Sequence, residues 1–180
     1  MKKIIAALAF FAFAQASVAE DAYAFKGWKL DEQISNMNMT GLLCSKGNGI
    51  IADKQCIEKA YKSSETIAGA PIQFMVLFFF DDVLSSIAIR EDEKYFNQIR
   101  DAMIEKYGKP TSENNEPIQN RAGASFDNSI LEWDNSVSKI QLKRRSGKID
   151  ASSIVYSSKS GLAESGKRSK QNAASGSHDL

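Results

Sequence analysis

The sequence predicts a single α+β domain: an antiparallel sheet of about five strands, covered by one main amphipathic helix and closed by one disulfide. Three observations lead to this fold class. Residues 72–80 contain a single polar side chain, which favours a buried strand. Residues 83–90 form a second strand after a short acidic turn, and residues 92–107 carry apolar side chains at helical spacing. Strands with one helix packed on them are typical of the α+β class.

The first nineteen residues have the pattern of a secretory signal peptide. Lys2 and Lys3 precede an apolar stretch at residues 4–14, and small residues at 17–19 predict cleavage after Ala19. The apolar stretch is shorter than the roughly 20 residues that span a bilayer as a helix. No cysteine near the cleavage position offers a lipid anchor. We therefore expect a soluble protein of the periplasm or the cell exterior, without a membrane anchor.

The domain itself is expected at residues 20–157. The leader takes two of the 23 basic residues with it, which leaves 21 basic against 22 acidic residues. A nearly balanced charge gives no electrostatic footprint for nucleic acid. Residues 158–180 are rich in serine, lysine and glycine, a composition that predicts a disordered polar tail.

The two cysteines, Cys44 and Cys56, predict a structural disulfide. In an oxidising compartment they should pair, and a loop of this length stabilises the fold by about 3 kcal/mol. The alternatives are free thiols or metal ligands. A metal would need further soft ligands, and the one histidine, His178, lies in the polar tail. We expect neither a metal nor a cofactor.

The elements before the long strand are assigned in chain order. Residues 20–30 form an extended aromatic segment, and Asp31 caps a short helix. A turn at residues 47–49 lies inside the disulfide loop. Residues 53–64 place Cys56, Ile57, Ala60 and Tyr61 on one helical face and predict a second short helix.

The long strand at residues 72–80 is apolar on both sides. Alternation puts Ile72, Phe74, Val76, Phe78 and Phe80 on one face, and Gln73, Met75, Leu77 and Phe79 on the other. One helix covers only one face. We assign the first set to the core, and Met75, Leu77 and Phe79 become the candidate interaction surface. The expected core is Phe74, Val76, Phe78, Ile87, Phe96, Ile99, Met103 and Trp133.

The helix at residues 92–107 is the clearest local element. Asp92 is placed to cap it, the apolar stripe runs from Phe96 to Tyr107, and Gly108 ends it before Pro110. Residues 111–128 are polar and predict a long loop. A second hairpin at residues 130–133 and 137–143, and a last strand at residues 152–156, complete the sheet.

The candidate catalytic chemistry is limited to carboxylates and lysines. A triad built on histidine is excluded by the position of His178. Asp81 and Asp82 could be an acid pair, but a hairpin tip needs polar residues, and the turn interpretation is favoured. Glu91, Asp92 and Glu93 fit a helix first turn, where the helix dipole favours negative charge. No catalytic residues are assigned.

Several phrases carry a resemblance. They are residues 25–27, 66–69, 79–89 and 105–110, followed by Gly123-Ala124 and Trp133. Together they resemble small secreted bacterial proteins without assigned activity, over most of residues 25–156. The layout is also similar to envelope assembly domains of the BamE type and to secreted inhibitor proteins. This second likeness implies a binding module rather than an enzyme.

The function predicted from the sequence is therefore that of an exported, non-enzymatic binding protein, either an envelope adaptor or an inhibitor or immunity-type protein. Its partner would be another protein or a second copy of the chain. The alternative is a hydrolase that acts on glycans with carboxylates alone. Such an enzyme requires two acidic side chains that face each other across a cleft, roughly 5 to 9.5 Å apart.

Overall fold

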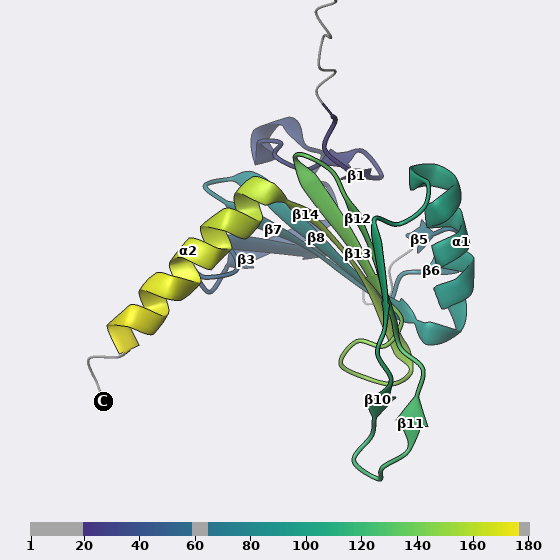
Figure 1. The fold of residues 1–180 in the computed structure, drawn as a ribbon. Coiled ribbons are helices and arrows are strands. Elements are labelled where there is room, and N and C mark those ends of the chain that lie inside the picture. The colour runs from purple at the N-terminus through teal and green to yellow at the C-terminus, as the bar shows by residue number, and fades with distance from the viewer. Residues whose placement is uncertain (1–19, 59–64, 177–180) are drawn as a thin grey trace, which may run out of the picture.

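The computed structural model describes residues 20–58 and 65–176 of the 180-residue chain. The predicted signal peptide lies outside these residues. The fold is α+β and is built on one large antiparallel sheet (Figure 1). The sheet has eight strands, not the five expected, because three segments predicted as helix or loop also contribute strands. In spatial order they are β3 (Leu42–Lys46), β4 (Lys54–Glu58), β7 (Phe74–Phe80), β8 (Val83–Asp92), β14 (Ala151–Ser158), β13 (Ser138–Lys143), β12 (Ser129–Asp134) and β9 (Ser112–Asn115).

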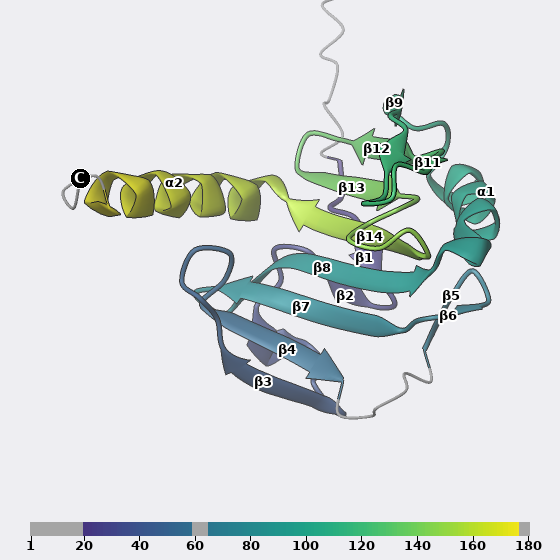
Figure 2. The ribbon, with the colours of Figure 1, turned by 90° about the horizontal axis from the view of Figure 1, so that it is seen from below.

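One face of the sheet, the convex face, is covered by the other elements. They are helix α1 (Phe96–Tyr107), the 3₁₀ turns η1 (Ile34–Asn36) and η2 (Glu93–Tyr95), and two small hairpins, β1 (Ala24–Phe25) with β2 (Trp28–Lys29), and β5 (Thr66–Ile67) with β6 (Ala70–Pro71). Figure 2 views the molecule from below, with β1 and β2 behind the sheet. The main core lies between this layer and the sheet.

The opposite, concave face has no such layer. Two elements project at its sides: helix α2 (Lys159–Gly176), and the hairpin of β10 (Ile118–Gln119) and β11 (Ser125–Phe126). In Figure 1 the sheet arches between these two elements, and in Figure 2 the strands from β3 to β14 lie open toward the viewer. The concave face is therefore bordered but not covered by the described residues.

The local predictions around β7, β8 and α1 are confirmed. Asp81 and Asp82 form the turn, with φ of 48° and 62°, the left-handed conformation that a tight two-residue hairpin requires. The Asp92 side chain accepts a hydrogen bond from the Lys94 backbone N–H at the start of η2, which leads into α1. The Trp133 ring N–H donates to the Gly108 carbonyl oxygen at 2.8 Å and fixes the helix end to β12.

The assignment of the two faces of β7 was wrong about which face the covering layer takes, although Val76 is buried as expected, with 7% of it exposed. Met75, Leu77 and Phe79 are buried in the main core, with at most 1% of each residue exposed, whereas Phe74 is 50% exposed on the concave face. The pattern alone could not distinguish the faces, because both are apolar. The covered face is the one on which the segments that cross the sheet lie. Helix α1 and the β1–β2 hairpin both lie on the face that carries Leu77.

Three other assignments also differ from the structure. The helix expected at residues 53–64 is strand β4 over its described part, and residues 59–64 lie outside the description. The loop expected at residues 111–128 contains β9, β10 and β11. The tail expected to be disordered forms α2 from Lys159 to Gly176. In the first two cases strand pairing outweighs local composition.

Helix α2 is held near its middle by an arginine. Arg168 pairs with Asp53 and with Glu164, and its guanidinium lies 4.6 Å from the centre of the Phe80 ring. The hydrogen bonds from Arg168 hold the pKa of both carboxyl groups below their usual values. A tertiary anchor of this kind explains why so polar a segment is helical.

Candidate interaction face

The concave face carries a continuous apolar row across five strands. Leu43 lies opposite Ile57, Ile57 opposite Val76, Val76 opposite Ala88, and Ala88 opposite Val155. Residues directly opposite in an antiparallel pair have Cβ atoms about 5 Å apart on the same face. These residues come from three separate parts of the sequence, the hairpin of β3 and β4, the hairpin of β7 and β8, and strand β14, and strand pairing brings them together.

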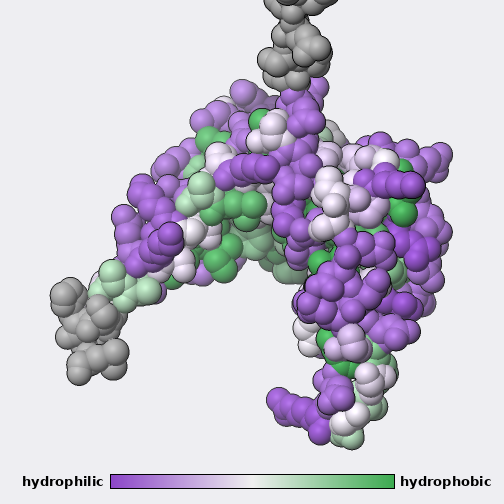
Figure 3. Space-filling model, viewed as in Figure 1, coloured by the Kyte–Doolittle hydropathy of each residue, from purple (hydrophilic) through white to green (hydrophobic). Residues whose placement is uncertain are grey.

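Several side chains of this face are exposed. Leu43 is 53% exposed, Ile57 36% and Phe74 50%, and Leu162 in the first turns of α2 is 49% exposed. Figure 3 shows apolar surface gathered in the hollow between α2 and the β10–β11 hairpin. A contiguous apolar patch bordered by polar groups marks a binding surface more often than an isolated exposed side chain does.

The row becomes polar beyond β14. Val155 is followed by Gln141 and then by Glu132. Lys139 pairs with Glu132 at 2.7 Å, and Lys159 pairs with Asp134 at 2.8 Å. The hydrogen bond from Lys139 lowers the pKa of Glu132. This half of the face is thus polar, with its acidic groups already partnered.

A parallel row closer to the β10–β11 hairpin contains two cations. Phe74 lies opposite Arg90, Arg90 opposite Ser153, Ser153 opposite Lys143, and Lys143 opposite Ile130. Neither Arg90 nor Lys143 forms an ion pair with any residue in the described ranges. The two strand spacings between them place their backbones roughly 10 Å apart.

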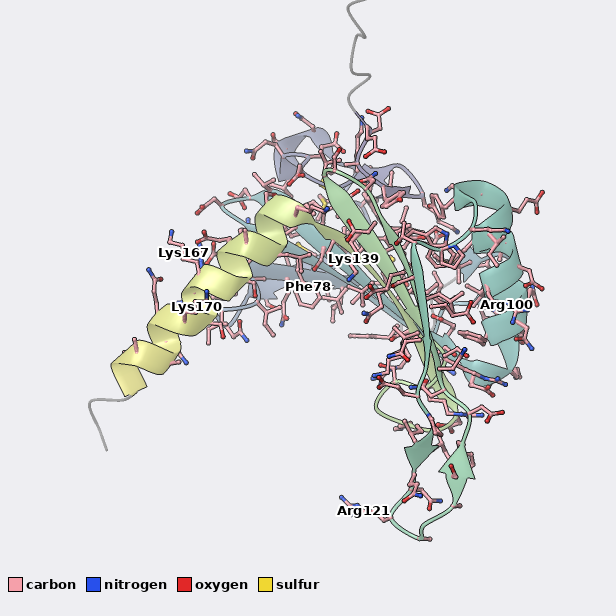
Figure 4. The ribbon with its side chains drawn as sticks, viewed as in Figure 1. Phe78, Arg100, Arg121, Lys139, Lys167 and Lys170 are labelled. Atoms are coloured by element: carbon pink, nitrogen blue, oxygen red, sulfur yellow. A yellow bond between two sulfur atoms is a disulfide. The ribbon has the colours of Figure 1, made fainter. Side chains whose placement is uncertain are left out.

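Figure 4 labels Phe78 and Lys139, which belong to a third row of the same face. Phe78 lies opposite Ser86, Ser86 opposite Ser157, and Ser157 opposite Lys139. The Phe78 side chain is half-buried. The concave face is therefore mainly apolar on β3, β4 and β7, mixed on β8 and β14, and mainly polar on β13 and β12.

The close packing of Gly161 on β8 fixes where α2 leaves the sheet. A Cβ at this position would lie 2.6 Å from the Ser85 Cβ and 3.1 Å from the Ser85 Cα. Ser158 supports the same turn, because its hydroxyl oxygen accepts a hydrogen bond from the Gly161 backbone N–H at 3.0 Å. Only a residue without a side chain fits this approach.

The residues predicted from the sequence are placed as follows. Cys44 and Cys56 form the expected disulfide between directly paired positions of β3 and β4. Met75, Leu77 and Phe79 contribute to the core and not to a surface. Asp81 and Asp82 lie exposed at a hairpin tip, where Asp82 pairs with Lys54, so they do not form an opposed pair across a cleft.

One titratable group was missed. Glu91 belongs to β8, not to a helix first turn, and it is 0% exposed. Neither carboxylate oxygen has a hydrogen-bond partner among the described residues. Burial raises the pKa of Glu91 to about 8, so the group is mainly protonated at neutral pH. The alternation of Ile87, Ile89 and Glu91 in the sequence was the signal that could have revealed it.

Metal and membrane features were also sought in the described part of the chain. Residues 20–58 and 65–176 contain no group of three or more histidine, cysteine, aspartate or glutamate side chains arranged to hold a metal ion. Over the same ranges, no helix combines the length and the apolar character needed to cross a bilayer.

Comparison with known proteins identifies a family. The model of a family described as "Uncharacterised protein" matches residues 54–173, more than half of the chain. The chain belongs to this family. The match begins at β4 and ends within α2, so it contains most of the concave face. No curated protein and no solved structure matches the chain. The expected likeness to BamE-type domains and to inhibitor proteins is not shown by these comparisons.

Proposed function

We propose that this chain is a non-enzymatic binding protein that is exported to the periplasm or the cell exterior and holds another protein against its concave face. Either an envelope adaptor or an inhibitor would use such a surface. The signal-peptide pattern and the Cys44–Cys56 disulfide support export, because disulfides persist in oxidising compartments.

The observation that carries the proposal is the uncovered apolar row. An antiparallel sheet can leave one face to solvent, but that face is then usually polar. Here Leu43, Ile57 and Phe74 remain exposed on it. A partner that covered them would bury apolar surface at about 25 cal/mol per Å², which favours association.

A second copy of the chain is the less suitable partner. A two-fold contact between concave faces centred on the row of Arg90 and Lys143 would bring the same cations of the two copies together. Like charges brought together in an interface oppose association. A different protein avoids this repulsion, and we therefore favour a heterologous partner.

Photo-crosslinking in cells tests the proposal. A photoreactive residue placed at Phe74, on the concave face, should give one discrete adduct with another protein, and mass spectrometry would identify it. The matched control carries the same residue at Asn97, which is exposed on α1 on the other side of the sheet. It should give no such adduct.

The outcomes separate the alternatives. An adduct with an enzyme that the protein inhibits supports the inhibitor, and an adduct with a resident envelope component supports the adaptor. An adduct of the chain with itself would replace the heterologous partner by a homodimer. Equal crosslinking from Phe74 and Asn97, or none from Phe74, would refute the concave face as the binding surface.

A further inference from the structure

We infer that the partner segment held on the concave face is acidic, with carboxylates that reach Arg90 and Lys143 beside an apolar stretch that covers Ile57 and Phe74. This inference rests on the proposed function and specifies the chemistry of the partner.

Two cations lie near each other on the concave face. Arg90 and Lys143 flank Ser153 on the same face of adjacent strands. The Arg90 guanidinium lies beside Gly147 in the β13–β14 loop, with its Nη2 3.6 Å from where a Gly147 Cβ would be. Arg90 is exposed and Lys143 half-exposed, and neither has an ion-pair partner among the described residues. Carboxylates of a partner can accept hydrogen bonds from either cation, and an arginine can bind a carboxylate with two parallel N–H donors.

The acidic groups of the concave face already have partners within the chain. Glu132 accepts hydrogen bonds from the Gln141 amide and the Ser112 hydroxyl in addition to its pair with Lys139. Asp134 pairs with Lys159, and Asp92 pairs with Lys94. The unpaired charge that the face offers to a partner is therefore positive, which selects an acidic segment over a basic one.

Apolar side chains lie next to both cations. Phe74 lies opposite Arg90, and Ile130 lies opposite Lys143, so each cation has an apolar neighbour in the same row. The bordering elements add positive charge. Arg121 projects from the tip of the β10–β11 hairpin, and Lys170 lies on α2 (Figure 4). A segment that alternates acidic and apolar side chains matches this arrangement.

The experiment selects random linear peptides displayed on phage against the purified, disulfide-bonded protein. Enriched peptides should combine aspartate or glutamate with large apolar residues. Their affinity, measured by fluorescence anisotropy, should fall about tenfold for Arg90→Glu or Lys143→Glu and should weaken as salt is raised. The matched control is Lys109→Glu, an exposed lysine that follows α1, and it should leave the affinity unchanged.

A second variant distinguishes a failure of the acidic-partner inference from a failure of the proposed function. Ile57→Asp removes the apolar contact but leaves both cations in place. Peptides that need Ile57 but show no acidic preference, or that bind Arg90→Glu equally well, would overturn the acidic partner and leave the proposed function standing. If wild type enriches no peptide beyond the Ile57→Asp variant, both fail. Binding of a labelled single-stranded oligonucleotide through Arg90 and Lys143, with no peptide enriched, would also overturn the inference.

Discussion

The two faces of the central sheet are both apolar where β7 crosses the molecule, yet only one of them forms the main core. On the convex face Met75, Leu77 and Phe79 lie beneath the covering layer, whereas on the concave face Phe74 is half exposed. The side chains of the two sets are alike in kind. The difference comes from the path of the connections, since α1 and the N-terminal segment both cross the same side. Hydrophobicity thus determines that a strand is central, but topology determines which of its faces is covered.

The largest expected effect is at the centre of the convex face. Ile99 on α1 is fully buried, so Ile99→Asp would place an unpaired charge in the core. We expect a loss of about 4 kcal/mol or more of unfolding free energy, enough to prevent accumulation of folded protein. Soluble yield and urea unfolding would measure it. A variant that melts with wild type would show that α1 does not cover the sheet in solution.

The disulfide gives the next largest effect, and it tests the β3 end of the sheet. Replacing both Cys44 and Cys56 by serine should lower the unfolding free energy by about 3 kcal/mol, because the bridge closes a short loop. Ser45→Ala, on the same strand, is the control. Thiol labelling of denatured, non-reduced protein should give no signal before reduction, and two labelled cysteines afterwards. Free thiols in freshly isolated protein would contradict the bridge.

Glu91 allows a pH test of the convex face. Its folded pKa of about 8 exceeds the ordinary 4.5, so between these pH values the folded state holds a proton that the unfolded state releases. The free energy of unfolding should therefore fall as pH rises through this window, by up to about 1.4 kcal/mol per pH unit. Below the window both states are protonated, and this group contributes no slope.

Glu91→Gln should remove that slope. The amide cannot ionise but still needs hydrogen-bond partners, so we expect a loss of about 1 kcal/mol relative to wild type at pH near 5 and a gain of about 2 to 3 kcal/mol at pH near 8. Urea unfolding at several pH values would measure it. Glu105→Gln, an exposed glutamate on α1, is the control. If wild type and Glu91→Gln lose stability in parallel across the window, Glu91 is not buried in its protonated form.

The smallest expected effect on stability is on the concave face. Phe74→Asp should lower the unfolding free energy by about 1 to 2 kcal/mol, well below the effect of Ile99→Asp, because only half of the Phe74 surface is buried. The same change should abolish crosslinking and peptide binding at this face. Comparing it with Ile99→Asp gives the sharpest test of the difference between the faces. A large destabilisation by Phe74→Asp would mean that some part of this chain covers the concave face.

The sequence predicted the elements whose signals are local. The turn at Asp81-Asp82, the cap at Asp92 and the apolar stripe of α1 each lie within a few residues, and each was assigned correctly. The disulfide also followed from counting cysteines. Strand β9 could not be found in this way, because it is wholly exposed and is a strand only through its pairing with β12.

The candidate face was even less accessible to sequence reasoning. Its apolar row joins positions from Leu43 to Val155, and no pattern in the sequence indicates the strand register that places them side by side. The pair of Arg90 and Lys143 likewise depends on β14 lying between β8 and β13. Helix α2 depends on Arg168 finding Asp53, far away in sequence. Such features arise from tertiary structure, which composition does not encode.

The close approach of Gly161 to Ser85 has a consequence for how this family can vary. The direction of α2 is fixed at two places, where Gly161 packs on β8 and where Arg168 pairs with Asp53, so the turns beyond Arg168 do not determine it. Beyond Arg168 they lie exposed, so substitutions there meet few constraints from the fold. Selection can therefore alter the chemistry of one wall of the hollow turn by turn while its angle to the sheet stays constant. The part of α2 up to Arg168 is thus fixed by its contacts with the rest of the domain, and the exposed turns beyond it can change without altering those contacts.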